Sequence, residues 1–199
     1  MSVGVEVDAD LLARLVIGDE SAFIDLIERY HLRLLRLAGS FVARRDVAED
    51  VVQETWIAVL NGIGGFQGRS AFRSWLFQIC VNKAKSAAVR EQRVVPVDPA
   101  DLDVDAADFA ADGSFAVSPQ RWADQLSQQA ADSALVEHVR RAIEALPAGQ
   151  RQVLTLRDVE GLTAAEVSAA LSITDVNQRV LLHRGRRQVR RALEGAEQR

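Results

Sequence analysis

Apolar residues recur at three-and-four spacing along most of the chain, which is the period of an α-helix, and alternating strand patterns are nearly absent. The pattern breaks at Gly18, where Asp19 or Ser21 can cap the following helix, and again where four glycines fall between Gly62 and Gly68. We therefore predict an all-α fold that opens with four helices. These cover about residues 11–18, 19–38, 46–60 and 71–90.

The helical pattern stops at about residue 94. Three of the four prolines follow, and residues 96–137 hold nine acidic side chains against one basic side chain, Arg121. Low hydrophobicity with one-sided charge cannot support a packed core. We predict a first helical domain over residues 8–93, a flexible acidic linker over residues 94–130, and a second helical domain over residues 131–195.

In the second domain, helices are expected from about residue 131 to 146, from Pro147 to Asp158 and over residues 162–170. Thr163 and Glu166 have the spacing of a capping box. A three-residue turn and a second cap, Thr174, precede a long helix over residues 175–193. This order of helices is that of a helix-turn-helix, whose second helix enters the DNA major groove.

The net charge of −4 would discourage a nucleic-acid role, but the charges are segregated. Residues 176–193 hold six arginines and no acidic residue. The start of this helix is placed to reach base edges, and its later arginines to contact phosphates. The alternative is a solvated basic face on a helical hairpin.

Other function classes find little support. No run of eighteen apolar residues and no signal-peptide pattern is present, which argues against membrane insertion or export and favours the cytoplasm. The single cysteine, Cys80, allows neither a disulfide nor a thiolate metal site within the chain. His31, His138 and His183 lie far apart, outside any catalytic motif. We expect no enzyme activity, cofactor, metal or small-molecule substrate.

The second domain resembles region four of extracytoplasmic-function (ECF) sigma factors, which reads the promoter −35 element. The similar features are LP..QR..V..L.D.EG, then EV...L.I, then RVLLHR.R..VR. The first domain resembles region two of the same family. DVAEDVVQETW is similar to the helix that binds core polymerase, and FQGRSAFRSWLFQICVNKAK to the segments that melt and read the −10 element. Together the resemblance covers about 130 of the 199 residues, in the order of the family.

The resemblance implies that one polar helix face docks on the clamp coiled coil of the largest RNA polymerase subunit, with a further contact at the polymerase flap. From the residues alone, a solvated acidic face would be the ordinary interpretation. The implied polymerase contacts are Asp46, Glu49, Asp50, Gln53 and Glu54.

For the −10 element, the glycine-rich loop and the next helix are implied to hold an extruded base and to follow phosphates. A plain surface turn, and core positions for Phe72 and Trp75, are the alternatives from the residues alone. The implied contacts are Phe66, Arg69, Ser70, Phe72, Arg73, Trp75, Asn82, Lys83, Lys85 and Arg90.

The −35 contacts are expected on the second helix of the helix-turn-helix and at its cap. Ser172 stands where the family usually has glycine, so we expect a strained turn. Gln178 stands where the family often has valine, so we expect the first turn of the helix to pack or read differently. Gly185 replaces a common alanine in the helix interior, which costs about 0.5–1 kcal/mol. The expected contacts are Thr174, Asp175, Asn177, Gln178, Arg179, His183, Arg184, Arg186, Arg187 and Arg190.

The sequence thus predicts an alternative sigma factor that binds core RNA polymerase and promoter DNA, and the resemblance also implies an anti-sigma factor. Two other classes remain open. An ordinary helix-turn-helix regulator would bind operator DNA without polymerase. A sigma mimic would only sequester an anti-sigma factor and would not need basic DNA-facing surfaces.

Overall fold

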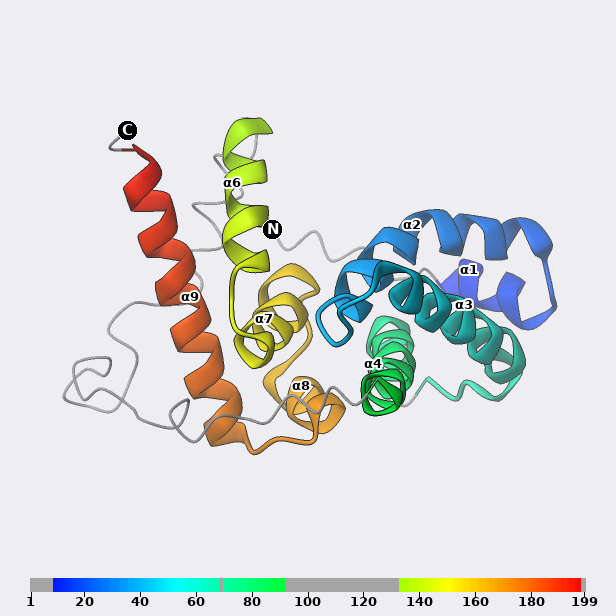
Figure 1. The fold of residues 1–199 in the computed structure, drawn as a ribbon. Coiled ribbons are helices and arrows are strands. Elements are labelled where there is room, and N and C mark those ends of the chain that lie inside the picture. Colours follow the sequence, from blue (N-terminus) through cyan, green and yellow to red (C-terminus); the bar gives the residue numbers. More distant parts are fainter. Residues whose placement is uncertain (1–8, 69, 92–132, 198–199) are drawn as a thin grey trace. The chain divides into compact units, whose positions relative to one another are not determined.

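The computed structural model describes residues 9–68, 70–91 and 133–197 (Figure 1). Every regular element in these residues is helical, in agreement with the predicted all-α fold. The chain forms two compact units. Of the described residues, the first unit holds 9–91 together with 160–172, and the second holds 133–159 and 173–197. The predicted linker, residues 94–130, lies outside the described residues.

The first unit is a bundle in which α2, α3 and α4 bury one face each. Its centre holds Leu26, Leu34 and Phe77, all with no exposed surface, and Tyr30 meets Phe77 edge to face at 6.2 Å between ring centroids. Cys80 is buried here, and burial raises the pKa of its thiol to about 12. The elements are α1 (Ala9–Val16), α2 (Glu20–Ala38), α3 (Arg45–Gly62), the 3₁₀ turn η1 (Ile63–Gly65), α4 (Phe72–Arg90) and α8 (Ala164–Leu171).

Two helix starts can be compared with the sequence prediction. Asp19 is the cap of α2, since its carboxylate accepts the backbone N–H groups of Ser21 at 2.9 Å and Ala22 at 3.2 Å. α3 begins at Arg45, one residue earlier than predicted, without a side-chain cap. Asp46 lies in the first turn, where the negative charge complements the helix dipole.

Gly62 is favoured by close packing rather than by its backbone angles. A Cβ atom at this position would lie 3.2 Å from Cζ2 of Trp75. The indole of α4 therefore lies directly against the C-terminal end of α3, and this contact helps to set where the glycine-rich loop begins.

The second unit consists of α6 (Ser133–Glu144), α7 (Ala148–Leu154), the π-helical turn η4 (Thr155–Val159) and α9 (Asp175–Glu197). The helix predicted from Pro147 to Asp158 is therefore present over residues 148–159, and its second half widens into the π turn. α9 also continues four residues beyond the predicted end at Leu193.

Gly185 has a packing reason in this unit. A Cβ atom there would lie 3.2 Å from Cδ1 of Leu154 and 3.5 Å from the carbonyl oxygen of Gln150. The absence of a side chain lets α9 approach α7, which offsets the helix-propensity cost of glycine inside α9.

A matched pair of leucines on α2 tests the core of the first unit. Leu26 is fully buried and Leu32 is 63% exposed. We expect Leu26→Ala to lower the free energy of unfolding by about 2–5 kcal/mol, because a cavity remains. Leu32→Ala should change it by less than about 0.5 kcal/mol. Urea unfolding followed by circular dichroism measures both, and equal losses would contradict this core.

Candidate functional site

The polar face of α3 is presented as the sequence predicts. Asp46, Glu49, Asp50 and Gln53 are exposed, while Val51, Val52, Thr55 and Val59 on the other side are buried. Arg44 pairs with Asp46 and holds the pKa of that carboxyl below its usual range, and Arg45 pairs with Glu49 at 2.9 Å. Asp50 and Gln53 are therefore the exposed groups at the centre of this face.

Glu54 links two sets of residues that the sequence assigns to different partners. Its carboxylate lies 3.4 Å from Nζ of Lys83 and 3.6 Å from Nη2 of Arg90, both on α4. All three side chains are more than a third exposed, so the ion pairs are screened by water and individually weak. A predicted polymerase contact thus adjoins two predicted phosphate contacts.

Three aromatic rings meet where the glycine-rich loop joins α4. The centroid of Phe66 lies 5.7 Å from that of Phe72 and 5.2 Å from that of Trp75. Phe72 is buried, whereas Phe66 and Trp75 are half-buried. Phe72 therefore belongs to the core, whereas Phe66 and Trp75 keep part of their surface exposed. Ser70 is exposed beside them, and Arg69 lies outside the described residues.

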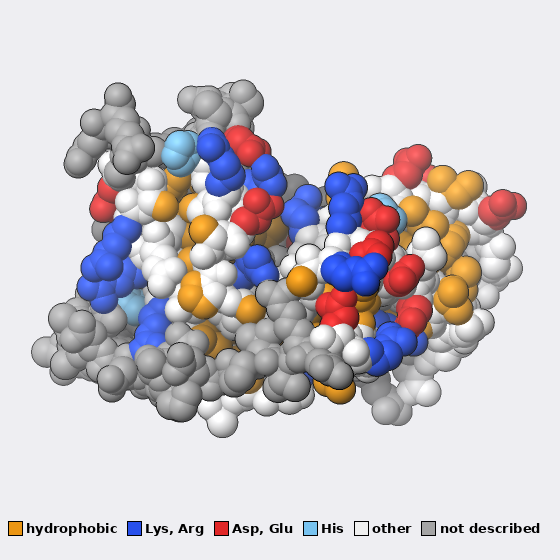
Figure 2. All heavy atoms as spheres, in the orientation of Figure 1, with side chains coloured by type: hydrophobic (Ala, Val, Ile, Leu, Met, Phe, Trp, Pro, Cys, Tyr) orange, Lys and Arg blue, Asp and Glu red, His pale blue; other side chains and the backbone are white. Residues whose placement is uncertain are grey.

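The other residues of α4 that are predicted to contact the −10 element differ in their surroundings. Some are exposed, and others donate hydrogen bonds within the protein. Asn82 is exposed and accepts a hydrogen bond from Gln78 at 3.1 Å. Arg73 instead donates to the carbonyl of Gly161, and Lys85 donates to the carbonyl of Ala170 at 2.9 Å. Burial lowers the pKa of Lys85. On the visible face of the first unit, acidic and basic side chains are intermingled (Figure 2).

The capping box predicted before α8 is present. Glu166 accepts from the backbone N–H of Thr163 at 2.7 Å, and Thr163 Oγ1 accepts from the backbone N–H of Glu166 at 3.3 Å. α8 ends at Leu171, and its C-cap residue Ser172 is left-handed, with φ of 59° and ψ of 44°. This confirms the expected conformation for a serine at the glycine position.

The start of α9 is exposed. Thr174 caps it, with Oγ1 accepting the backbone N–H of Asn177 at 3.2 Å, as predicted. Thr174, Asp175 and Arg179 are exposed, and Arg179 Nε donates to the carbonyl of Asp175 at 3.2 Å. Figure 2 shows basic side chains along α9. These residues form a polar helix start followed by arginines.

Two residues predicted to contact the −35 element, Gln178 and Arg186, face the protein interior or another side chain instead of solvent. Gln178 is only 1% exposed, so its side chain packs inside instead of facing solvent. Arg186 is held by the carboxylate of Asp158 through two hydrogen bonds of 2.7 and 2.5 Å, and both side chains are largely buried. Sequence reasoning did not identify Asp158, because its partner lies 28 residues away.

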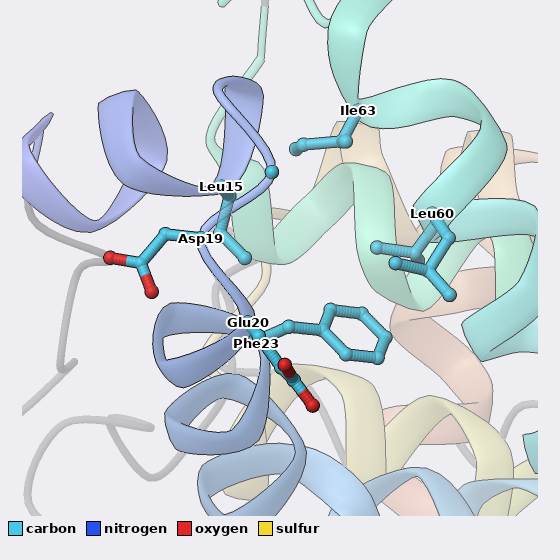
Figure 3. Close-up of a pocket in the computed structure, with 8 residues that line it drawn as sticks. Leu15, Asp19, Glu20, Phe23, Leu60 and Ile63 are labelled. Atoms are coloured by element: carbon cyan, nitrogen blue, oxygen red, sulfur yellow. The ribbon is translucent and has the colours of Figure 1, made fainter.

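A cavity of about 250 Å³ opens between α1, α2 and α3. In Figure 3, Leu15, Phe23, Leu60 and Ile63 converge on this space, whereas the carboxylate of Asp19 turns away from it. Its lining is almost entirely apolar, and Asp19 is committed to the cap of α2. No group of three His, Cys, Asp or Glu side chains that would hold a metal occurs in the described residues.

Family models match both of the domains predicted from the sequence. The family model of sigma-70 region 2 matches residues 26–94, and that of sigma-70 region 4 matches residues 137–189. The ECF RNA polymerase sigma-E factor of Escherichia coli K12 is 34% identical over 164 residues, which is 82% of each chain. The chain belongs to the ECF family of RNA polymerase sigma factors. It is a transcription initiation factor and not an enzyme.

Further relatives agree. The sigma-E factor of Salmonella typhimurium LT2 is 34% identical over 164 residues, 82% of each chain. The RNA polymerase sigma-H factor of Pseudomonas aeruginosa is 32% identical over 193 residues, 95% of each chain. Within the described part of this sigma factor, no helix is long and apolar enough to span a membrane.

Two solved structures share the fold. CnrH, in complex with the cytosolic domain of CnrY, has a TM-score of 0.55 and 22% identity, covering 96% of this chain and 99% of its own. The sigma factor RpoE of Bartonella quintana, in complex with the anti-sigma factor NepR, has a TM-score of 0.52 and 23% identity, covering 85% and 97%.

The Asp158–Arg186 pair generates a stability prediction for the second unit. Asp158→Asn leaves a largely buried guanidinium without its counter-charge, so we expect a loss of about 3 kcal/mol in the free energy of unfolding. Glu144→Gln is the control, because Glu144 pairs with Arg140 at an exposed site and should change it by less than about 1 kcal/mol. Chemical denaturation measures both. Asp158→Asn as stable as the wild type would show that the pair contributes nothing.

Proposed function

We propose that this ECF sigma factor binds core RNA polymerase through the polar face of α3 and directs it to promoters by reading −10 and −35 elements. The observation that carries the proposal is the match to both sigma regions, in order, on a chain whose α3 presents Asp50 and Gln53 to solvent. The proposed division is residues 8–93 for polymerase and the −10 element, 94–130 as linker, and 131–195 for the −35 element.

The polymerase contact is proposed for the clamp coiled coil of the largest subunit. Exposed charges at such a contact set partner choice and association rate more than affinity. Asp50 and Gln53 are supported best, because Asp46 and Glu49 have arginine partners in this chain and Glu54 faces α4. We also propose that the second unit contacts the polymerase flap.

For the −10 element, Phe66 and Trp75 are the proposed stacking platform, since both rings keep exposed surface. Stacking an unpaired base on an aromatic ring is worth about 1–3 kcal/mol. Lys83, Arg90 and Asn82 are proposed to follow the phosphates, whose neutralisation makes binding depend on salt. Phe72 is not proposed to touch DNA, because its ring is only 4% exposed.

For the −35 element, the exposed helix start is proposed to meet base edges, and later arginines to meet phosphates. Two predicted contacts are not part of the proposal. Gln178 is buried, and Arg186 is held by Asp158. His183 is half-buried and is proposed to support the helix. The remaining contacts are Thr174, Asp175, Asn177, Arg179, Arg184, Arg187 and Arg190.

Regulation by an anti-sigma factor is also proposed. CnrH is described in complex with CnrY, and the Bartonella RpoE in complex with NepR. A chain of the same fold and family is suited to a partner of the same kind. We propose that the protein acts in the cytoplasm, where RNA polymerase and promoter DNA are found.

Run-off transcription with purified core polymerase and a promoter library tests the function. We expect transcripts from a subset of promoters only when this protein is added. A helix-turn-helix regulator would bind operator DNA without starting transcription, and a sigma mimic would bind only an anti-sigma factor. Absence of stimulated transcripts from every promoter would contradict the proposal.

Two variants test the proposed polymerase-binding surface and the proposed −35-binding surface independently. Asp50→Ala with Gln53→Ala should weaken core-polymerase binding by about tenfold or more, since each lost charge-assisted contact is worth about 1.5–3 kcal/mol. Arg179→Ala should leave core binding unchanged and lower binding to −35 duplex DNA, because an arginine–base contact is worth about 1–3 kcal/mol. Fluorescence anisotropy with labelled core and labelled duplex gives both affinities. Identical behaviour of both variants and the wild type would show that these residues are misassigned.

A further inference from the structure

Val176 is an exposed apolar residue in the part of α9 that is proposed to meet DNA bases. It is the second residue of the helix, and its exposed fraction is 63%. No other large apolar side chain of α9 is exposed among the described residues. The −35 contacts expected from the sequence do not include Val176.

The packing of the second unit does not use this side chain. α9 buries Val180, Leu181 and Val189, whereas Val176 lies outside that core. A β-branched residue also loses side-chain freedom in a helix, so valine favours the helix less than alanine or lysine would. Single exposed apolar residues are common on protein surfaces, so exposure alone does not indicate a role. The position of Val176 on the helix does.

Val176 lies on the same exposed face of α9 as Arg179. An α-helix completes one turn in about 3.6 residues, so side chains three apart are neighbours on its surface. Arg179 is exposed, and its Nε donates to the carbonyl of Asp175 at 3.2 Å. Thr174 orders this first turn, because its Oγ1 accepts the backbone N–H of Asn177 at 3.2 Å. Val176 therefore projects from a capped helix start, beside an arginine.

The base edges of the major groove offer one kind of apolar group. Thymine presents its C5-methyl group there, whereas the other groups that distinguish the base pairs are hydrogen-bond donors and acceptors. A branched alkyl side chain has neither donor nor acceptor, so the methyl group is the feature that it can recognise. Packing the two together removes apolar surface from water, which favours binding. Residues near the start of a recognition helix are those that reach base edges.

We propose that Val176 is a specificity-determining residue for the −35 element, and that its isopropyl group packs against the C5-methyl group of a thymine in the major groove. The inference rests on the proposed function, since it names a base that the start of α9 reads. Arg179 and Val176 then have different roles. The arginine supplies hydrogen bonds, and the valine supplies an apolar contact that prefers thymine to cytosine.

Removing a single methyl group from the DNA tests this contact. The −35 duplex is taken from a promoter that the full chain transcribes with core polymerase, and each of its thymines is replaced in turn by deoxyuridine. Deoxyuridine keeps the hydrogen-bonding groups of thymine and lacks only the methyl group. We expect one replacement to weaken binding of the holoenzyme by about fourfold, which corresponds to one buried methyl group. 5-Bromodeoxyuridine at that position should restore binding, because bromine has nearly the size of a methyl group.

Val176→Ser removes the protein side of the contact. Serine and valine have similar helix propensities and the site is exposed, so α9 should stay folded. We expect this variant to bind the thymine and deoxyuridine duplexes equally. Val176→Ile keeps a branched alkyl group and should retain the wild-type ratio of the two affinities. Val159→Ser is the matched control and should also retain it, because Val159 is an exposed valine outside α9.

Anisotropy titration of each holoenzyme with the labelled duplexes gives these ratios. The ratio is the decisive quantity, because a partial loss of folded protein lowers both affinities alike. If no thymine of the −35 element responds to loss of its methyl group, Val176 does not read thymine. The same conclusion follows if Val176→Ser has the wild-type ratio, or if the element contains no A·T pair.

These outcomes are distinguishable from failure of the sigma function. A wild-type protein that starts transcription, but whose binding does not depend on the thymine methyl group, leaves the sigma function standing and overturns the role of Val176. If no promoter of the library is transcribed, the sigma function fails, and the role of Val176 at a −35 element fails with it.

Discussion

Each helix of this protein has one face to bury, and that burial decides which polar side chains remain for partners. On α3, the residues Val51, Val52, Thr55 and Val59 enter the core, so Asp50 and Gln53 point to solvent. The helical period makes this division rigid, because a rotation that hides the acidic face would expose the valines. The surface proposed to bind polymerase is therefore a direct consequence of the core of the first unit.

The burial of one helix face also affects residues of α9 that the sequence predicts to contact DNA. On α9, Val180, Leu181 and Val189 are buried, and the period of the helix takes Gln178 inward as well. Arg186 lies near the same side, where Asp158 neutralises it. The number of arginines along α9 therefore overstates the charge that α9 exposes, because Arg186 pairs with Asp158 at the π turn.

Polar contacts between residues far apart in the chain bring charged side chains of different helices together. Glu54 approaches Lys83 and Arg90, so its carboxylate lies beside two cations of α4. Glu160 reaches Arg33 across more than a hundred residues of chain and brings residues 160–172 onto the first unit. Each of these contacts joins residues that are far apart in the chain, so the surroundings of the charged side chains follow from the packing of the first unit.

The sequence by itself determined the helices, the caps at Asp19, Thr163 and Thr174, the left-handed Ser172, and the family. These follow from local period, turn chemistry and motif spacing, which need no knowledge of distant residues. Only the tertiary structure decided that Gln178 is buried. It also decided that Arg186, Arg73 and Lys85 donate hydrogen bonds to acceptors within the protein. Ion pairs and side-chain burial depend on residues far away in the chain, such as Asp158 and Gly161, and no local pattern encodes them.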